Sequence, residues 1–334
     1  MTIDTNRLTV DPPRGAVPRG APGLGEGELV ARLRAAGCVF AEDEARLLLA
    51  EAPADRLAEW VDRRVAGEPL EHVLGWALFD GLRVSVAPGV FVPRRRSELL
   101  VRQAVAALRS RDERTSGNRA GGAAPEELDE PLAPPVVVEL CCGTAAIAAA
   151  IGHRLPGVVL HAADVDPAAV ACARRNLAAS GGTAWLGDLD APLPADLRGR
   201  VDVLVANAPY VPSAEVPFMP TEARDHEPLR ALDGGPDGVD VQRRVVAAAP
   251  AWLGPDGVLV VETSRRQAPV TAAAFRAAGL TARVVRSERL DATVVVGRRD
   301  RRRNQHSPAE PQRDTVVRVR LTGGRFRSHG EALG

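Results

Sequence analysis

The hydrophobic residues of the chain follow two different patterns. From about Glu28 to Val73 they recur at helical spacings, which predicts a small helical domain over residues 26–75. From Val136 to about residue 297, short β-branched runs alternate with helix-like segments. Such alternation is typical of a doubly wound α/β sheet with mostly parallel strands, here with an antiparallel finish. We therefore expect an α/β protein whose main domain spans residues 136–297.

Segments of another character separate and flank these regions. Asp80-Gly81 lies between two apolar runs, so residues 76–109 are interpreted as a β-hairpin linker followed by a connecting helix. The arginine run at 94–96 is interpreted as a solvated helix start, with an anion contact as the alternative. Residues 110–135 predict a flexible loop, because Gly, Pro and Glu dominate them. Residues 1–25 and 298–334 are predicted to be disordered, and the alternating stretch 315–321 has no evident partner strand.

The composition, with 45% hydrophobic and 26% charged residues, is that of a globular protein. The formal net charge is zero, but residues 298–334 carry +6 and the rest of the chain −6. A broad nucleic-acid surface on the rest of the chain is therefore not indicated. Only the basic tail, residues 298–334, is a candidate for contact with RNA or the ribosome. No membrane-spanning run is present, and a cytoplasmic location is expected. The cysteines match neither a disulfide framework nor a metal site, so no metal is expected: Cys38, Cys141, Cys142 and Cys172.

The apolar run 201–206 ends in Asn207-Ala208-Pro209-Tyr210. In an open α/β sheet, ligands bind at the carboxyl ends of strands. The side-chain carbonyl of Asn207 and the backbone carbonyl of Ala208 can accept two N–H bonds from a planar amide or amine, and Pro209 keeps Ala208 extended. Tyr210 offers a flat face beside them. Two acceptors on one nitrogen can orient its lone pair toward an electrophile. The alternative is an ordinary Asn-x-Pro turn.

Three further strand ends suggest a cofactor. The first strand, 136–140, enters a helix through a turn of small residues that lets a ligand approach the backbone: Cys141, Cys142, Gly143, Thr144 and Ala145. Asp164 follows the turn by about 20 residues, as suits a ribose diol, and Asp166 is expected to cap the next helix; either could instead be only a cap. Asp188 could accept from an adenine amino group or serve a turn. The turn is not GxGxxG and suits a ligand without phosphate, so S-adenosylmethionine fits this set.

These motifs resemble the HemK/PrmC-type protein-glutamine N5-methyltransferases over about residues 28–297. Pro93-Arg94 and Glu98 are similar to the family's "IPRPETE" segment, and Glu227-Pro228 with residues 231–238 to its "EP…ALDGGxDG" segment. The resemblance implies a helical substrate-recognition domain, a hairpin linker and a Rossmann-like class I SAM-dependent methyltransferase domain. It also implies methylation of the glutamine amide in the Gly-Gly-Gln loop of peptide-chain release factors, or of a ribosomal protein in a related branch.

The resemblance also implies roles for single residues. By the match to the family's Asn-Pro-Pro-Tyr, Asn207 and the Ala208 carbonyl would hold the glutamine amide, with Pro209 and Tyr210 completing the site. The family's Asp-Leu-Gly-Thr-Gly-Ser-Gly is Glu-Leu-Cys-Cys-Gly-Thr-Ala here, at 139–145, and Leu189 replaces an aromatic. These departures indicate a divergent branch. The cofactor contacts implied are Cys141, Cys142, Gly143, Thr144, Ala145, Asp164, Asp188, Leu189 and Asn207.

Two alternatives remain open. N6-adenine methylation of DNA or RNA uses a similar acceptor–Pro–Pro–aromatic site on a flipped base. The acidic body and the lack of an evident target-recognition domain count against it, and the basic tail counts for it. The other alternative is a non-catalytic binding protein that kept the fold, motivated by Cys141 and Ala145 in the cofactor turn.

Overall fold

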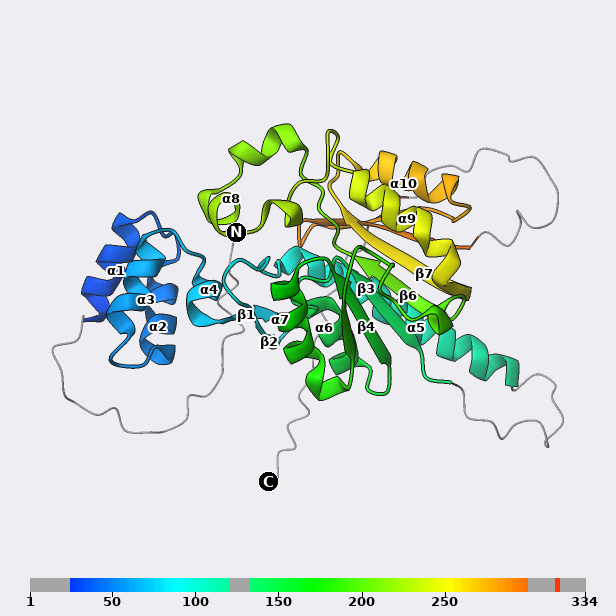
Figure 1. Cartoon of the computed structure of the whole chain (residues 1–334), viewed down its shortest axis with the longest axis horizontal. Helices are drawn as coiled ribbons and strands as arrows, with labels where there is room; N and C mark the ends of the chain where they lie inside the picture. The colour runs from blue at the N-terminus through cyan, green and yellow to red at the C-terminus, as the bar shows by residue number, and fades with distance from the viewer. Residues whose placement is uncertain (1–24, 120–132, 300–315, 319–334) are drawn as a thin grey trace, which may run out of the picture. The chain divides into compact units, whose positions relative to one another are not determined.

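The computed structural model describes residues 25–119, 133–299 and 316–318 (Figure 1). The chain divides into two compact units, Met1–Val65 and Ala66–Gly334. The first unit contains α1 (Glu26–Ala35), α2 (Ala41–Glu51) and α3 (Leu57–Val65). Leu29, Leu33 and Leu48 are fully buried in it, which explains the helical spacing of apolar residues. A buried ion pair between Arg64 and Glu44, at 2.6 Å, ties α3 to α2.

The second unit begins with a short helix and a hairpin. Helix α4 (Leu70–Leu74) falls in this unit, although the helical domain was predicted to extend to residue 75. The reason is a hydrogen bond of 2.8 Å between His72 Nε2 and the carbonyl oxygen of Val90, in the same unit. Strands β1 (Trp76–Phe79) and β2 (Leu82–Ser85) pair antiparallel, as predicted. Asp80 and Gly81 both have positive φ, as a type I′ turn requires.

The second unit is built on a mostly parallel sheet with the order β10-β8-β9-β7-β6-β3-β4-β5. Strands β3 to β7 pair in parallel and β9 pairs antiparallel with β7 and β8, which confirms the predicted antiparallel finish. The strand order reverses beside β3, whose neighbours are β4 and β6, and this is where an open sheet binds ligands. The strands are β3 (Val136–Leu140), β4 (Val159–Asp164), β5 (Thr183–Leu186), β6 (Val201–Ala206), β7 (Leu253–Thr263), β8 (Arg283–Ser287), β9 (Ala292–Arg298) and β10 (Val316–Arg318).

Helices cover both faces of this sheet. Val137 packs in the core beneath α5, α6 and α7, whereas its neighbour Val138 packs in the core beneath α9 and α10. Because successive residues face opposite cores, the central strands are mostly apolar rather than alternating. Figure 1 shows α9 and α10 side by side. The helices are α5 (Glu98–Arg119), α6 (Ala146–Arg154), α7 (Pro167–Leu177), α8 (Thr221–His226), α9 (Asp240–Trp252) and α10 (Ala268–Ala277).

Two predictions about the connecting segments were wrong. The loop predicted from residue 110 begins as helix, because α5 continues to Arg119 and Arg111 pairs with Asp202 of β6 at 2.8 Å. Within the predicted tail, Arg298 ends β9, and β10 pairs in parallel with β8, where Val316 lies opposite Val284. Without β10, one edge of β8 would have no partner strand. Strand β8 is therefore the partner of β10 that the sequence did not indicate. The rest of the segments predicted to be flexible or disordered lies outside the described residues, at 1–24, 120–132, 300–315 and 319–334.

The connection between β6 and α9 is not a simple loop. It contains a 3-10 helix (Ser213–Phe218), helix α8 and a second 3-10 helix (Leu229–Ala231), none of which the sequence analysis predicted. Each is too short to show a helical period. Among the described helices, none has the length and apolarity that a bilayer crossing requires.

Candidate active site

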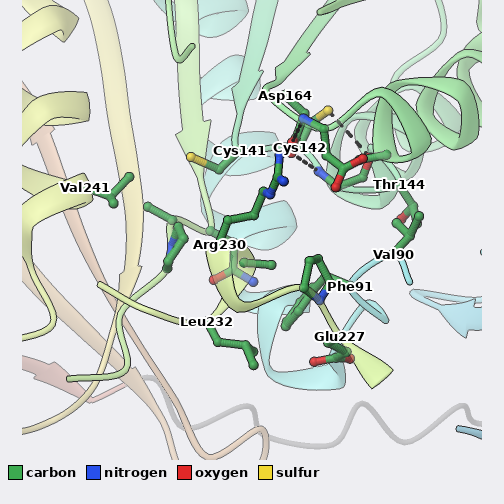
Figure 2. A pocket seen from close by; sticks show the side chains of 18 of the residues that line it. Val90, Phe91, Cys141, Cys142, Thr144, Asp164, Glu227, Arg230, Leu232 and Val241 are labelled. Atoms are coloured by element: carbon green, nitrogen blue, oxygen red, sulfur yellow. Dashed lines mark hydrogen bonds between the residues drawn. The ribbon is translucent and has the colours of Figure 1, made fainter. Parts of the chain in front are cut away.

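A cavity of about 230 Å³ lies at the carboxyl ends of the parallel strands (Figure 2). All but one of the predicted site residues line it. The exception is Ala145, which is fully buried behind the turn at the start of α6. The predicted residues that line the cavity are Cys141, Cys142, Gly143, Thr144, Asp164, Asp188, Leu189, Asn207, Ala208, Pro209 and Tyr210.

The turn between β3 and α6 has three residues with a glycine-like backbone, of which only one is a glycine. Cys141, Gly143 and Ala145 have φ values of 52°, 52° and 54°. A left-handed conformation costs a residue with a Cβ about 1–2 kcal/mol. The turn is closed by hydrogen bonds from the Cys142 N–H to the Ala163 carbonyl (3.1 Å) and from the Ala145 N–H to the Cys142 carbonyl (2.7 Å). The structure thus keeps the backbone shape that admits a ligand, at the cost of strain at Cys141 and Ala145.

Asp164 is held by the backbone around it. Its Oδ2 accepts from the Gly143 N–H at 2.8 Å, and its Oδ1 accepts from the Asp166 N–H at 2.9 Å. Burial raises the pKa of Asp164. A carboxylate has about four lone-pair positions, so both oxygens can accept further bonds. Asp166 caps α7 by accepting from the Ala168 N–H at 2.8 Å, which confirms the cap predicted for it.

Two more carboxylates lie at the ends of neighbouring strands. Glu139 was not predicted as a site residue, but it lines the cavity, and burial raises its pKa to about 8. Its Oε2 accepts from the Ala148 N–H at 2.7 Å. The signal was an acid within the otherwise apolar run 136–140. Asp188 forms an exposed ion pair with Arg244 at 2.6 Å, a partner that the sequence did not indicate.

The end of β6 presents polar groups to the same cavity. The Asn207 Nδ2 donates to Ser97 Oγ at 3.2 Å, so its side-chain carbonyl oxygen remains as an acceptor. Ala208 is buried, and no described residue donates a hydrogen bond to its carbonyl oxygen. The Tyr210 hydroxyl donates to Glu262 Oε1 at 3.1 Å, and burial raises the pKa of Tyr210, so the phenol stays neutral.

The segment 231–238 braces the backbone after Asn207. The Val211 N–H donates to the Leu232 carbonyl at 3.0 Å, and the Gly234 N–H donates to the Val211 carbonyl at 2.8 Å. A Cβ on Gly234 would lie 2.7 Å from the Pro209 carbonyl oxygen, so only glycine permits this approach. Gln267 Nε2 adds a bond of 2.8 Å to the Tyr210 carbonyl.

The arginine run contacts anions within the protein, which makes the solvated interpretation wrong for two of its members. Arg94 pairs with the buried carboxylate of Glu227, and Arg96 Nε donates to Glu262 at 3.2 Å. Glu227 also accepts from the Val92 N–H at 3.1 Å. Figure 2 shows Phe91 and Glu227 across the cavity from Asp164 and Cys142. The two segments singled out by resemblance therefore meet at one cavity.

Comparison with known proteins shows the family of this chain. Residues 126–222 match the family model described as methyltransferase small domain. The release factor glutamine methyltransferase of Streptomyces coelicolor is 38% identical over 64% of this chain and 68% of that protein. The one from Moorella thermoacetica is 35% identical over 69% and 74%. The 4-amino-L-phenylalanine/4-methylamino-L-phenylalanine methyltransferase of Streptomyces pristinaespiralis is 33% identical over 74% and 78%. This chain belongs to the HemK/PrmC-type family of release factor glutamine methyltransferases.

Proposed function

We propose that this protein transfers a methyl group from S-adenosylmethionine to the side-chain nitrogen of a glutamine in the Gly-Gly-Gln loop of a peptide-chain release factor. The observation that carries the proposal is the pairing of two acceptors, the Asn207 side chain and the Ala208 carbonyl, in one cavity with the cofactor turn and Asp164. Family membership supports the same reaction.

The residues present fit S-adenosylmethionine. The cofactor carries a positive charge, and carboxylates from three adjacent strand ends line the cavity. Glu139 would accept from the cofactor's ammonium group, Asp164 from the ribose hydroxyls and Asp188 from the adenine amino group. The strained turn at 141–145 lets the ligand approach the backbone. When bound, the cofactor supplies an electrophilic methyl group on a sulfonium.

The protein's own residues overcome the low nucleophilicity of an amide nitrogen. Asn207 Oδ1 and the Ala208 carbonyl accept its two N–H bonds, which turns the nitrogen lone pair toward the methyl group. The amide nitrogen would bond to the methyl carbon while the methyl–sulfur bond breaks and leaves its electron pair on the sulfur as a neutral thioether. The two carbonyl dipoles would stabilise the positive charge that develops on the nitrogen. The nitrogen would then pass one proton to solvent water. Tyr210 and Phe91 line the cavity and offer apolar faces to the planar amide.

An aromatic amine is a second candidate substrate. The Streptomyces pristinaespiralis relative, whose name specifies an amino group on an aromatic ring, matches over 78% of its length. Two carbonyl acceptors beside an aromatic face would bind an aryl amine as well as an amide, because both present N–H donors in a plane. The same reasoning keeps the amino group of adenine as a third candidate.

The test is methylation of a purified release factor by the purified protein with S-adenosylmethionine, read by peptide mass spectrometry. We expect one methyl group on the glutamine of the Gly-Gly-Gln loop. Asn207→Ala should lower the rate by about 100-fold or more, as expected for loss of a preorganised group, with cofactor binding retained. Asp164→Ala should weaken cofactor binding first. Methylation of 4-aminophenylalanine or of an oligonucleotide, with the release factor unmodified, would overturn the proposal.

A further inference from the structure

We propose that Ser97 and Glu262 are positioning residues that form a hydrogen-bond relay to Asn207 and decide which end of its side-chain amide faces the substrate. The inference deepens the proposed function and rests on it. It concerns residues that sequence reasoning did not select: Ser97 ends the 3-10 helix Arg95–Ser97, and Glu262 is near the end of β7.

The residues of the relay are buried. Ser97 is 2% exposed and Glu262 is 1% exposed. Asn207 Nδ2 donates to Ser97 Oγ at 3.2 Å. The Ser97 hydroxyl lies near the Glu262 carboxylate and favours its charged form, and the buried Oε2 of Glu262 accepts from no described residue, so it is free to receive the Ser97 proton. The two ends of the relay are neighbours in the sheet, because Ala206 and Val261, the residues just before Asn207 and Glu262, are paired.

The direction of these bonds fixes the orientation of Asn207. An ionised carboxylate can only accept, so the single hydroxyl proton of Ser97 must point to Glu262. Toward Asn207 the Ser97 oxygen can then only accept a hydrogen bond, and only the NH₂ end of the Asn207 side chain can donate one. The Oδ1 end therefore faces the cavity as an acceptor for N–H donors. Without the carboxylate, the hydroxyl could donate to Oδ1, and either end of the amide would fit.

The same carboxylate also holds the aromatic wall of the site. The Tyr210 hydroxyl donates to Glu262 Oε1 at 3.1 Å, and Arg96 Nε donates to that oxygen at 3.2 Å. The Arg96 guanidinium lies over the Tyr210 ring, 5.7 Å from its centroid. Burial raises the pKa of Glu262, and Arg96 opposes that rise and favours the carboxylate form. Glu262 does not itself line the cavity, so it acts through Ser97 and Tyr210.

The first test is kinetic. Glu262→Gln keeps the shape but can donate, so the relay loses its direction; we expect kcat to fall by about 100-fold, with cofactor affinity within about twofold of the parent. Ser97→Ala should likewise lower kcat while cofactor affinity is retained. Ser97→Thr, which keeps a hydroxyl, should have most of the parent's kcat. Ser287→Ala, a buried serine at the end of β8, should leave kcat unchanged. Unchanged kcat in both Glu262→Gln and Ser97→Ala would overturn the relay, as would equal loss of cofactor binding.

A second measurement does not depend on the substrate. In ¹⁵N-labelled protein, the Asn207 side-chain NH₂ signals, identified by their loss in Asn207→Ala, should exchange slowly with water. The protection should persist in Ser97→Thr and disappear in Ser97→Ala and Glu262→Gln. Fast exchange in the parent protein would overturn the relay even if methylation occurs. Protection that follows this pattern would support it even if the release factor is not the substrate.

Discussion

At the scale of residues, carboxylates lie in the cavity and just behind its wall, and burial opposes their charge. Glu139 and Glu262 are buried and Asp164 is half-buried; burial raises the pKa of all three. Groups perturbed in this way cluster at functional sites. Glu262 has a guanidinium beside it, whereas the donors to Glu139 within the described part of the chain are backbone N–H groups. An isolated buried acid of this kind suits a site that receives a cationic ligand.

Glu139 should make the stability of the free protein depend on pH. Its folded-state pKa of about 8 exceeds its ordinary value of 4.5, so the folded state holds a proton that the unfolded state releases between these values. The favourable contribution is complete below about pH 4.5 and is lost as pH rises through about 8. Glu139→Gln should therefore raise the free energy of unfolding at pH 8.5 by on the order of 3 kcal/mol, and far less at pH 5. Urea unfolding at both pH values measures this, and parallel pH profiles for the two proteins would contradict it.

At the scale of elements, the sequence located the carboxyl ends of β4, β5 and β6 to within one residue, because an acid, a glycine or an Asn-x-Pro turn stands at each of them. The run 201–206 became β6 with the predicted bounds, and Asp166-Pro167 began α7 as expected. The backbone of the cofactor turn could not be predicted, because Cys141 and Ala145 give no sign of a left-handed conformation. The short helices in the connection between β6 and α9 were also missed. Tertiary hydrogen bonds hold this connection, and its helices are too short to show a helical pattern of apolar residues.

The cofactor turn allows a matched pair of substitutions. Gly143→Ala and Gly181→Ala both place a Cβ in open space at positive φ, so each should lower the free energy of unfolding by about 1–2 kcal/mol. Only Gly143 lines the cavity, and its new methyl group would occupy space that the cofactor needs. Calorimetric titration with S-adenosylmethionine should thus show weakened binding for Gly143→Ala alone. Equal affinities in the two variants would place the cofactor elsewhere.

At the scale of the whole molecule, the apolar strands predicted a parallel sheet that is covered on both faces. Val137 and Val138 point to opposite faces, so each face needs a hydrophobic core. Periodicity carries no information about contacts between distant segments. The pair between Arg94 and Glu227 joins residues 133 positions apart, and neither residue alone indicates it. The strand β10 was missed for the same reason, since its partner β8 lies far from it in the sequence.

The pair between Arg94 and Glu227 should matter for the stability of the second unit. Arg94→Met leaves a buried carboxylate without its cation, and we expect a loss of about 3 kcal/mol in the free energy of unfolding. The double variant Arg94→Met/Glu227→Leu should recover most of that loss, because an apolar pair replaces the charges. Arg224→Met, which breaks an exposed pair with Asp225, should change nothing measurable. Urea unfolding of the parent and the three variants measures these free energies. A double variant no more stable than Arg94→Met would contradict this expectation.

The central claim is that the acceptor pair at the end of β6 binds a glutamine amide. The most direct measurement is to incubate the protein with methyl-labelled S-adenosylmethionine and a bacterial lysate and to identify the labelled molecules by mass spectrometry. We expect label on the side-chain nitrogen of the glutamine in the Gly-Gly-Gln loop of a release factor, and none with Asn207→Ala. Label confined to nucleic acid or to small aromatic amines, or no label at all, would contradict it.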